Sequence, residues 1–197
     1  MLDRREVAKI KELRIGITGS PGTGKKTIAK GLGRLTGQKV ISINTIAIKT
    51  KSAKKMRGEF VVDIRKLRDQ KIETRGSIVV GHLLSLVIPS SKLDFVAILR
   101  CSPEVLRIRY LARRYSERKI RENIEAELLD LLSYSALKTY GRGKVSEFDT
   151  SRSKNPARVA KRILETIQGK RPKLYGIAKW SESASKSDRR LLRLMRS

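Results

Sequence analysis

The chain has 197 residues, with 46 Lys and Arg against 19 Asp and Glu, which gives a formal net charge of +27. A field of this sign attracts polyanions, so a nucleic-acid partner is expected, with a merely solvated basic surface as the alternative. A single cysteine, Cys101, excludes an internal disulfide, and no apolar stretch approaches the ~20 residues that span a bilayer, so we expect a cytoplasmic protein without a membrane partner.

The first half of the chain predicts two strands separated by a helix. Residues 13–18 form a short apolar run that leads into glycines, as a buried strand does before a tight turn. A helix should follow over residues 26–35, where apolar side chains recur at helical spacing, and a second strand over residues 40–44. Residues 49–58 hold five basic side chains and no acid, which indicates a mobile surface loop. Residues 60–72 then resemble a short helical segment.

The second half of the chain predicts three more strands, each followed by a helix or a turn. Cys101 should be a buried small hydrophobe, and Ser102 should cap a helix that has Pro103 at its first position. The strands are expected at residues 77–80, 94–100 and 144–151, and the helices from residue 103, over residues 116–137 and over residues 156–167.

This alternation predicts the fold class. Strands that alternate with helices form a parallel sheet covered on both faces, so we expect a three-layer α/β fold with a five-stranded parallel sheet. Ligands of such folds bind at the carboxyl ends of the strands. The polar groups expected there are residues 19–27, Gly81, His82, Arg100 and Asp149.

Residues 19–27 read GSPGTGKKT and have the spacing of a phosphate-binding loop. Gly19, Gly22 and Gly24 let successive backbone N–H groups point inward, the following helix contributes its positive end, and Lys25 reaches the outer phosphates. The loop follows a predicted strand and precedes a predicted helix, as the motif requires. Phosphate binding is therefore the strongest single inference from the sequence.

Further segments narrow this motif to one family. They are VVGHL at residues 79–83, AILRCSPEVLRIRYLARRYSERKIRENIEAELLD at residues 97–130, and EFDTSRSKNPARVAKRILETI at residues 147–167. With the loop, they resemble the adenylate kinases of the ribosome-assembly type, which are relatives of the coilin-interacting nuclear ATPase within the P-loop nucleoside monophosphate kinases. The resemblance covers roughly residues 12–168.

The resemblance implies a P-loop kinase fold and phosphoryl transfer between ATP and AMP, with some ATPase activity. It also implies a role in small-subunit ribosome maturation, with small-subunit ribosomal RNA and a ribosomal protein of the platform as partners. Arg113 matches the lid arginine that contacts ATP, and Arg57 is the residue expected to meet the monophosphate. The residues expected at the ATP phosphates are Gly19, Gly22, Thr23, Gly24, Lys25, Lys26 and Thr27.

The sequence departs from this family where magnesium is handled. Lys26 stands where the relatives have a Thr, and Val80 stands where they have an acid that helps to hold the metal. The ammonium of Lys26 can take over part of the metal's charge, or the site can have become a nucleotide-binding switch or a structural relic. We therefore expect ATP as the ligand and a turnover that depends less on Mg²⁺ than in the relatives.

Two further side chains have alternative roles. His82 falls at the family position that faces the γ-phosphate, where it would orient water or donate a hydrogen bond, and the alternative is a satisfied structural histidine. Asp149 either touches the adenine or caps the turn after the last strand, and capping is the preferred reading.

The chain is thus expected to contain a kinase-like domain over residues 1–168 and a basic tail over residues 169–197. Within the domain, residues 45–70 would bind the monophosphate and residues 112–123 would form the lid. Lys25, His82 and Arg113 would be the catalytic residues of an adenylate kinase. The alternative is a catalytically silent factor that binds nucleotide, RNA or a ribosomal protein on the same scaffold.

Overall fold

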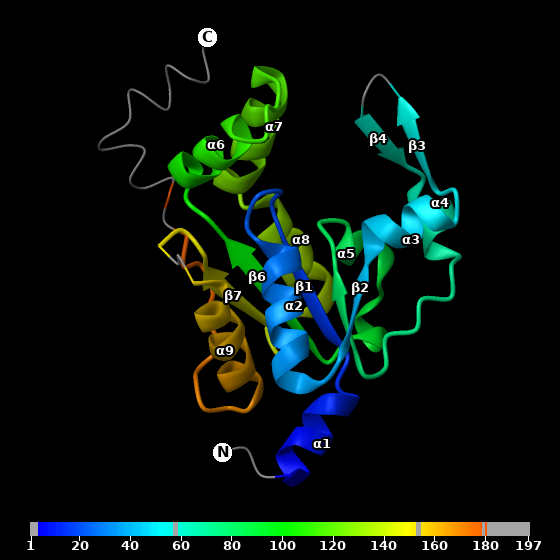
Figure 1. Ribbon diagram of the computed structural model, residues 1–197, viewed down its shortest axis with the longest axis vertical. Helices are drawn as coiled ribbons and strands as arrows, with labels where there is room; N and C mark the ends of the chain where they lie inside the picture. Colours follow the sequence, from blue (N-terminus) through cyan, green and yellow to red (C-terminus); the bar gives the residue numbers. More distant parts are fainter. Residues whose placement is uncertain (1–3, 57–58, 153–154, 179, 181–197) are drawn as a thin grey trace.

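A computed structural model of the protein describes residues 4–56, 59–152, 155–178 and Trp180. Its centre is a five-stranded parallel sheet with the strand order β2-β5-β1-β6-β7, which confirms the predicted fold class (Figure 1). In chain order the strands are β1 Ile15–Gly19, β2 Lys39–Ser42, β5 Ser77–Val80, β6 Phe95–Arg100 and β7 Val145–Asp149.

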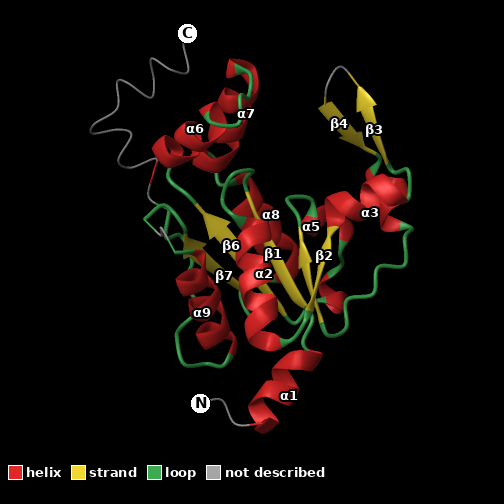
Figure 2. Ribbon diagram, viewed as in Figure 1, coloured by secondary structure: helices red, strands yellow, loops and turns green. Residues whose placement is uncertain are grey.

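The sheet lies between two layers of helices, because alternate side chains of its strands point to opposite faces (Figure 2). One face packs against α2 (Lys25–Thr36) and α9 (Pro156–Ile167). The other packs against α5 (Leu84–Val87) and α8 (Leu131–Tyr140). Helices α2 and α9 approach closely at Gly31, where an added Cβ would lie 3.3 Å from the Cβ of Ala160.

The remaining elements extend the two layers. Helix α1 (Arg4–Glu12) precedes β1 in the chain and was not predicted from the sequence. Between β2 and β6 come α3 (Ile43–Lys49), the antiparallel hairpin of β3 (Ala53–Met56) and β4 (Glu59–Val62), α4 (Ile64–Arg68) and the short 3₁₀ helix η1 (Ser90–Lys92). After β6 come α6 (Pro103–Leu111) and α7 (Glu117–Leu128). In the part of the chain that the structure describes, no helix has the length and apolar character needed to cross a membrane.

The hairpin corrects two predictions. The stretch over residues 49–58, expected as a mobile loop, contains β3, and residues 60–72, expected as helical, begin with β4 and become helical only at Ile64. Phe60, Val61 and Val62 favour a strand, and the side chain of Asp63 then caps α4 by accepting from the Lys66 N–H at 3.0 Å.

The end of one strand and the course of one helix also differ from the prediction. Strand β2 ends at Ser42, whose hydroxyl caps α3, so Ile43 and Asn44 are helical. The single helix expected over residues 116–137 is broken between α7 and α8 at Asp130, which has a left-handed backbone with φ of 53°. The Asp130 carboxylate pairs with Arg100 of β6, and this tertiary contact accounts for the break. Cys101 is fully buried, as expected.

Residues 173–178, which the sequence places in a tail outside the core, contact the edge strand β7, and we call them the C-terminal strap. The Glu147 N–H donates to the Leu174 carbonyl at 2.8 Å, and the Ile177 N–H donates to the Glu147 carboxylate at 2.9 Å. Ala178 is buried. The strap thus supplies hydrogen-bond partners to a strand edge that would otherwise be unpaired.

We expect a chain that ends at Arg171 to lose about 2 kcal/mol of unfolding free energy, because a buried carboxylate loses its backbone donor. Urea denaturation measures the change, and a chain that ends at Trp180, which keeps the whole strap, is the matched control. Equal stability of the two shortened chains would show that the strap contacts contribute nothing.

Candidate functional site

A cavity of about 630 Å³ lies at the carboxyl ends of the strands. Its lining residues come in part from the α6–α7 pair and from the β3–β4 hairpin, which project beyond the sheet in Figure 1. From the β1–α2 loop and α2 come Pro21, Gly22, Gly24, Lys25, Lys26 and Thr27. Facing them are Ser42, Asn44, Phe60, Val80, Gly81 and His82, and from the α6–α7 side come Arg113, Tyr115, Lys119, Glu122 and Asn123.

The backbone of the β1–α2 loop requires glycine. Gly22 and Gly24 have φ of 85° and 88°, in the left-handed region that other residues rarely adopt. At Gly22 an added Cβ would also lie 2.9 Å from Cε1 of Tyr110. The N-terminus of α2 then begins at Lys25, where the first backbone N–H groups have no acceptor within the helix. These donors make the end of α2 a suitable site for an anion.

Helix α6 holds the loop from outside. The Tyr110 hydroxyl donates to the Pro21 carbonyl at 2.6 Å, and Nη1 of Arg109 donates to the Gly22 carbonyl at 2.8 Å. Within the loop, the Thr23 hydroxyl donates to the Ser20 carbonyl at 2.9 Å. Because these contacts hold three loop carbonyls, the shape of the loop is set before any ligand arrives.

The ammonium group of Lys25 lies within the loop. Its Nζ donates to the carbonyls of Gly19 and Ser20, at 2.8 and 2.9 Å. The pKa of Lys25 is lowered to about 7, chiefly by burial; the carboxylate of Glu127 opposes the fall, and the nearby charges of Arg113 and Lys26 add to it. Near neutral pH Lys25 is therefore poised between its charged and neutral forms.

His82 follows β5 and lines the same cavity, half-buried. Burial lowers its pKa, and the neighbouring Lys25 charge acts in the same direction. The imidazole is therefore neutral at neutral pH, so it can donate one hydrogen bond and accept another.

The structure brings most of the predicted site residues to this cavity. Gly22, Gly24, Lys25, Lys26, Thr27, His82 and Arg113 all line it. Gly19 and Thr23 lie behind the lining: the Gly19 carbonyl accepts from Lys25, and Thr23 is fully buried. Arg57, expected at the monophosphate, lies outside the described residues.

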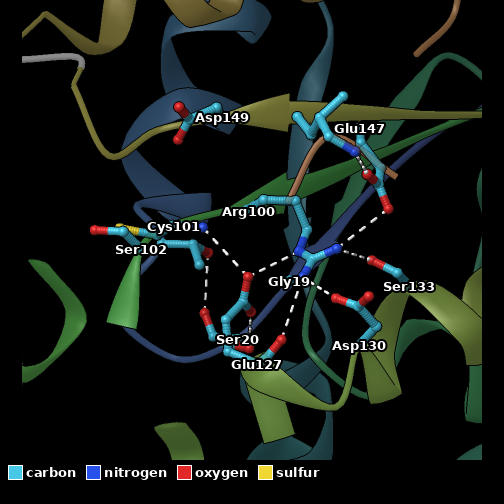
Figure 3. Close-up of polar contacts among 12 residues, drawn as sticks. Gly19, Ser20, Arg100, Cys101, Ser102, Glu127, Asp130, Ser133, Glu147 and Asp149 are labelled. Atoms are coloured by element: carbon cyan, nitrogen blue, oxygen red, sulfur yellow. Dashed lines mark hydrogen bonds and ion pairs between the residues drawn. The ribbon is translucent and has the colours of Figure 1, made fainter. Parts of the chain in front are cut away.

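Two residues that the sequence places at the carboxyl ends of the strands do not line the cavity. Asp149 accepts a hydrogen bond from the Ser151 N–H at 2.8 Å and caps the turn after β7, in line with the preferred reading. Arg100 is only 2% exposed and pairs with Glu127, Asp130 and Glu147 beneath the loop (Figure 3).

Sequence reasoning did not single out several cavity residues. Tyr115, Lys119, Glu122 and Asn123 fall within the segment expected as a lid, and Phe60 falls within the segment expected to bind the monophosphate. The resemblance predicts the two segments, but nothing in the local pattern of residues indicates which side chains turn toward the cavity.

The cavity offers little to a divalent cation held by protein carboxylates. Among the described residues that line it, Glu122 is the one carboxylate, and it is more than half exposed and pairs with Arg118 at 2.9 Å. Val80 is buried and apolar. Across the described residues, no group of three or more His, Cys, Asp or Glu side chains is arranged to hold a metal ion. The residues present thus do not fit a magnesium site built from protein carboxylates.

Comparison with known proteins places this geometry in a family. The family model described as "AAA domain" matches residues 15–130. A protein of Thermococcus onnurineus described as "Putative adenylate kinase" is 34% identical over 175 residues, which cover 87% of this chain and 93% of that protein. A protein of Methanocaldococcus jannaschii with the same description is 35% identical over 178 residues, covering 86% and 94%.

Among solved structures, a shikimate kinase from Acinetobacter baumannii, in complex with shikimate, matches 85% of this chain and 99% of its own. The TM-score is 0.53 at 22% sequence identity, so this likeness concerns the fold alone. The phosphate loop, the family model and the archaeal relatives agree with one another. The chain therefore belongs to the P-loop nucleoside monophosphate kinase family.

Proposed function

We propose that the protein is an adenylate-kinase-like enzyme that transfers the terminal phosphoryl group of ATP to AMP and forms two molecules of ADP. The observation that carries this proposal is the convergence on one cavity of the Lys25 amine, the N-terminus of α2 and the Arg113 guanidinium. The names of the archaeal relatives support the choice of ATP and AMP as substrates.

The charges around the cavity suit phosphoryl transfer. This reaction depends on positioning and on positive charge at the phosphate oxygens, more than on covalent help from the protein. Lys25, Lys26, Arg113 and Lys119 all line the cavity, against the single described carboxylate of Glu122. For Lys25 to reach a phosphate, its Nζ must exchange the Gly19 and Ser20 carbonyls for phosphate oxygens.

The acceptor nucleotide would lie on the opposite side of the cavity. Phe60 of β4 lines the cavity and is 60% exposed, so its ring offers an aromatic face to a base. Asn44, at the start of α3, offers an amide that can both donate and accept hydrogen bonds. Both side chains come from the stretch between β2 and β5, where the resemblance predicts monophosphate binding. Residues 112–123, which the resemblance predicts as the lid, contribute other residues to the lining of the cavity.

A catalytically silent nucleotide-binding factor is the second candidate. The apolar Val80 at the end of β5 favours it, because the residue cannot take part in a hydrogen-bonded water network around a metal ion. In the enzymatic reading the same feature leads to a weaker dependence on Mg²⁺, with the Lys26 ammonium supplying part of the charge.

We further propose that the protein acts on small ribosomal subunits, with small-subunit ribosomal RNA and a platform ribosomal protein as partners. The net charge of +27 supports an RNA partner. The resemblance to the ribosome-assembly type of adenylate kinase supports the choice of the small subunit.

In a coupled assay, AMP should raise ADP formation at least tenfold over ATP alone. The Lys25→Ala variant should lose about a hundredfold or more of this activity, because a charge that stabilises the transition state is removed. Lys30→Ala, an exposed position of α2 outside the cavity, is the matched control. If wild type and Lys25→Ala give the same background signal, only the binding role remains.

The same assay in EDTA tests the magnesium part of the proposal. A measurable fraction of turnover should persist without the divalent cation, because lysine side chains neutralise part of the phosphate charge. Turnover that vanishes in EDTA and returns with Mg²⁺ would count directly against the weaker dependence.

ATP binding should be coupled to protonation of Lys25, whose pKa in the empty loop is about 7. Bound phosphates favour the ammonium form and raise this pKa, so affinity should be highest below pH 7 and fall up to tenfold per pH unit above it. Calorimetry at about pH 8, in buffers of different ionisation enthalpy, should show uptake of nearly one proton. Lys25→Arg, which stays charged, should take up none; equal proton uptake by both proteins would assign the proton to another group.

Deleting residues 181–197 removes five basic side chains but keeps the C-terminal strap. Affinity for a fragment of small-subunit ribosomal RNA should fall, and the slope of log affinity against log salt should flatten by about 0.7 per lost phosphate contact. Replacing Leu191, Leu192 and Leu194 with Ala keeps the charge and should leave the slope unchanged. An unaltered slope after deletion would assign this charge to solubility.

A further inference from the structure

A buried ion cluster lies directly beneath the phosphate loop (Figure 3). Its centre is Arg100, the last residue of β6, whose Nε lies 2.7 Å from Oε1 of Glu127 on α7 and whose Nη1 lies 3.3 Å from Oε1 of Glu147 on β7. Asp130 also pairs with the guanidinium, and the Ser133 hydroxyl accepts from it at 2.9 Å. Arg100, Glu127 and Glu147 are each at most 3% exposed.

The cluster holds more negative than positive charge. Three carboxylates, those of Glu127, Asp130 and Glu147, share the one guanidinium of Arg100. A buried carboxylate is costly unless charge and hydrogen bonds compensate it. Of the three carboxylates, Glu127 is the one whose charge acts on the ammonium of Lys25 and favours it.

Glu127 connects this cluster to the loop through Ser20. Its Oε1 accepts from Arg100, and also from the Cys101 N–H at 3.3 Å, while its Oε2 accepts from the Ser20 hydroxyl. The carbonyl of the same serine accepts from Lys25 and from Thr23. The side chain of Ser20 therefore bonds to Glu127 in the core, while its main-chain carbonyl bonds to Lys25.

We propose that Glu127 is a positioning residue of the phosphate loop, which fixes Ser20 and places a negative charge behind Lys25 so that the amine meets the nucleotide as an ammonium. This inference rests on the proposed binding of ATP and adds to it the group that prepares the loop. Glu127 does not line the cavity, so it acts through Ser20 and Lys25 and not on the substrate itself.

The charged groups around Lys25 come from four elements. Glu127 on α7 favours its charged form, whereas Arg113 after α6 and Lys26 on α2 oppose it. His82 after β5 is near enough for the Lys25 charge to lower the pKa of the imidazole. Glu127 is thus the neighbour whose removal would lower the pKa of Lys25, so that the amine would lose its proton at a lower pH.

Glu147 offers a matched control for Glu127. Both carboxylates are buried and both pair with Arg100, but the second oxygen of Glu147 accepts from Ile177 of the C-terminal strap, whereas that of Glu127 accepts from Ser20. Replacing either glutamate removes an ion pair with Arg100, but only the replacement of Glu127 also removes a contact with the phosphate loop.

The test compares ATP affinity across pH for wild type, Glu127→Gln and Glu147→Gln. In Glu127→Gln the midpoint of the pH dependence should move down by about one unit, which makes affinity about fivefold weaker at pH 7 and about tenfold weaker at pH 8 and above. Glu147→Gln should keep the wild-type midpoint, even if its melting temperature falls as far as that of Glu127→Gln. A role in stability alone would lower the melting temperatures and leave both midpoints in place.

Ser20→Ala gives a second route to the same inference if Glu127→Gln fails to fold. It removes the link but keeps the carboxylate, so affinity should fall severalfold while the pH midpoint stays near that of wild type. Unchanged affinity in this variant would overturn the positioning role.

Two further results would be decisive. ATP binding by wild type with the same midpoint in Glu127→Gln would overturn this inference and leave the proposed function intact. Absence of ATP binding by well-folded wild-type protein would overturn both.

Discussion

The hydrogen bond from Ser20 to the carboxylate of Glu127 is the contact on which the site depends, because it ties the phosphate loop to the core. From the other side, α6 holds the loop through Tyr110 and Arg109. A glycine-rich loop gains its function from backbone freedom, and the same freedom would let it collapse without such supports. The fold therefore holds the loop in its shape with interactions among the protein's own residues.

Lys25 shows how burial and charge together produce a reactive group. Burial favours the neutral amine, the carboxylate beneath the loop favours the ammonium, and the resulting pKa is about 7. In the proposed function, a lysine balanced in this way would take its full charge when a phosphate binds. In the function proposed above, the surplus of basic side chains at the cavity would supply charge that a metal ion commonly contributes in P-loop kinases, and the apolar Val80 at the end of β5 fits that proposal.

The sequence predicted the five strands and the phosphate loop because both are local: apolar runs end in glycines, and the loop motif is contiguous. It did not predict the β3–β4 hairpin, which depends on pairing across a turn, or the helix break at Asp130, which depends on Arg100 thirty residues earlier. Glu127 was missed for the same reason, since it lies 107 residues from Ser20 and resembles any acid of an amphipathic helix. Contacts of that range are set by the fold, and no local pattern encodes them.

The most direct test of the account is a crystal structure with a dinucleotide in which a polyphosphate chain joins two adenosines. The account predicts that phosphate oxygens accept from the main-chain amides of residues 22–27 and from Lys25, whose Nζ leaves the Gly19 and Ser20 carbonyls, with one adenine beside Phe60. A dinucleotide bound elsewhere, with Lys25 still on those carbonyls, would contradict it.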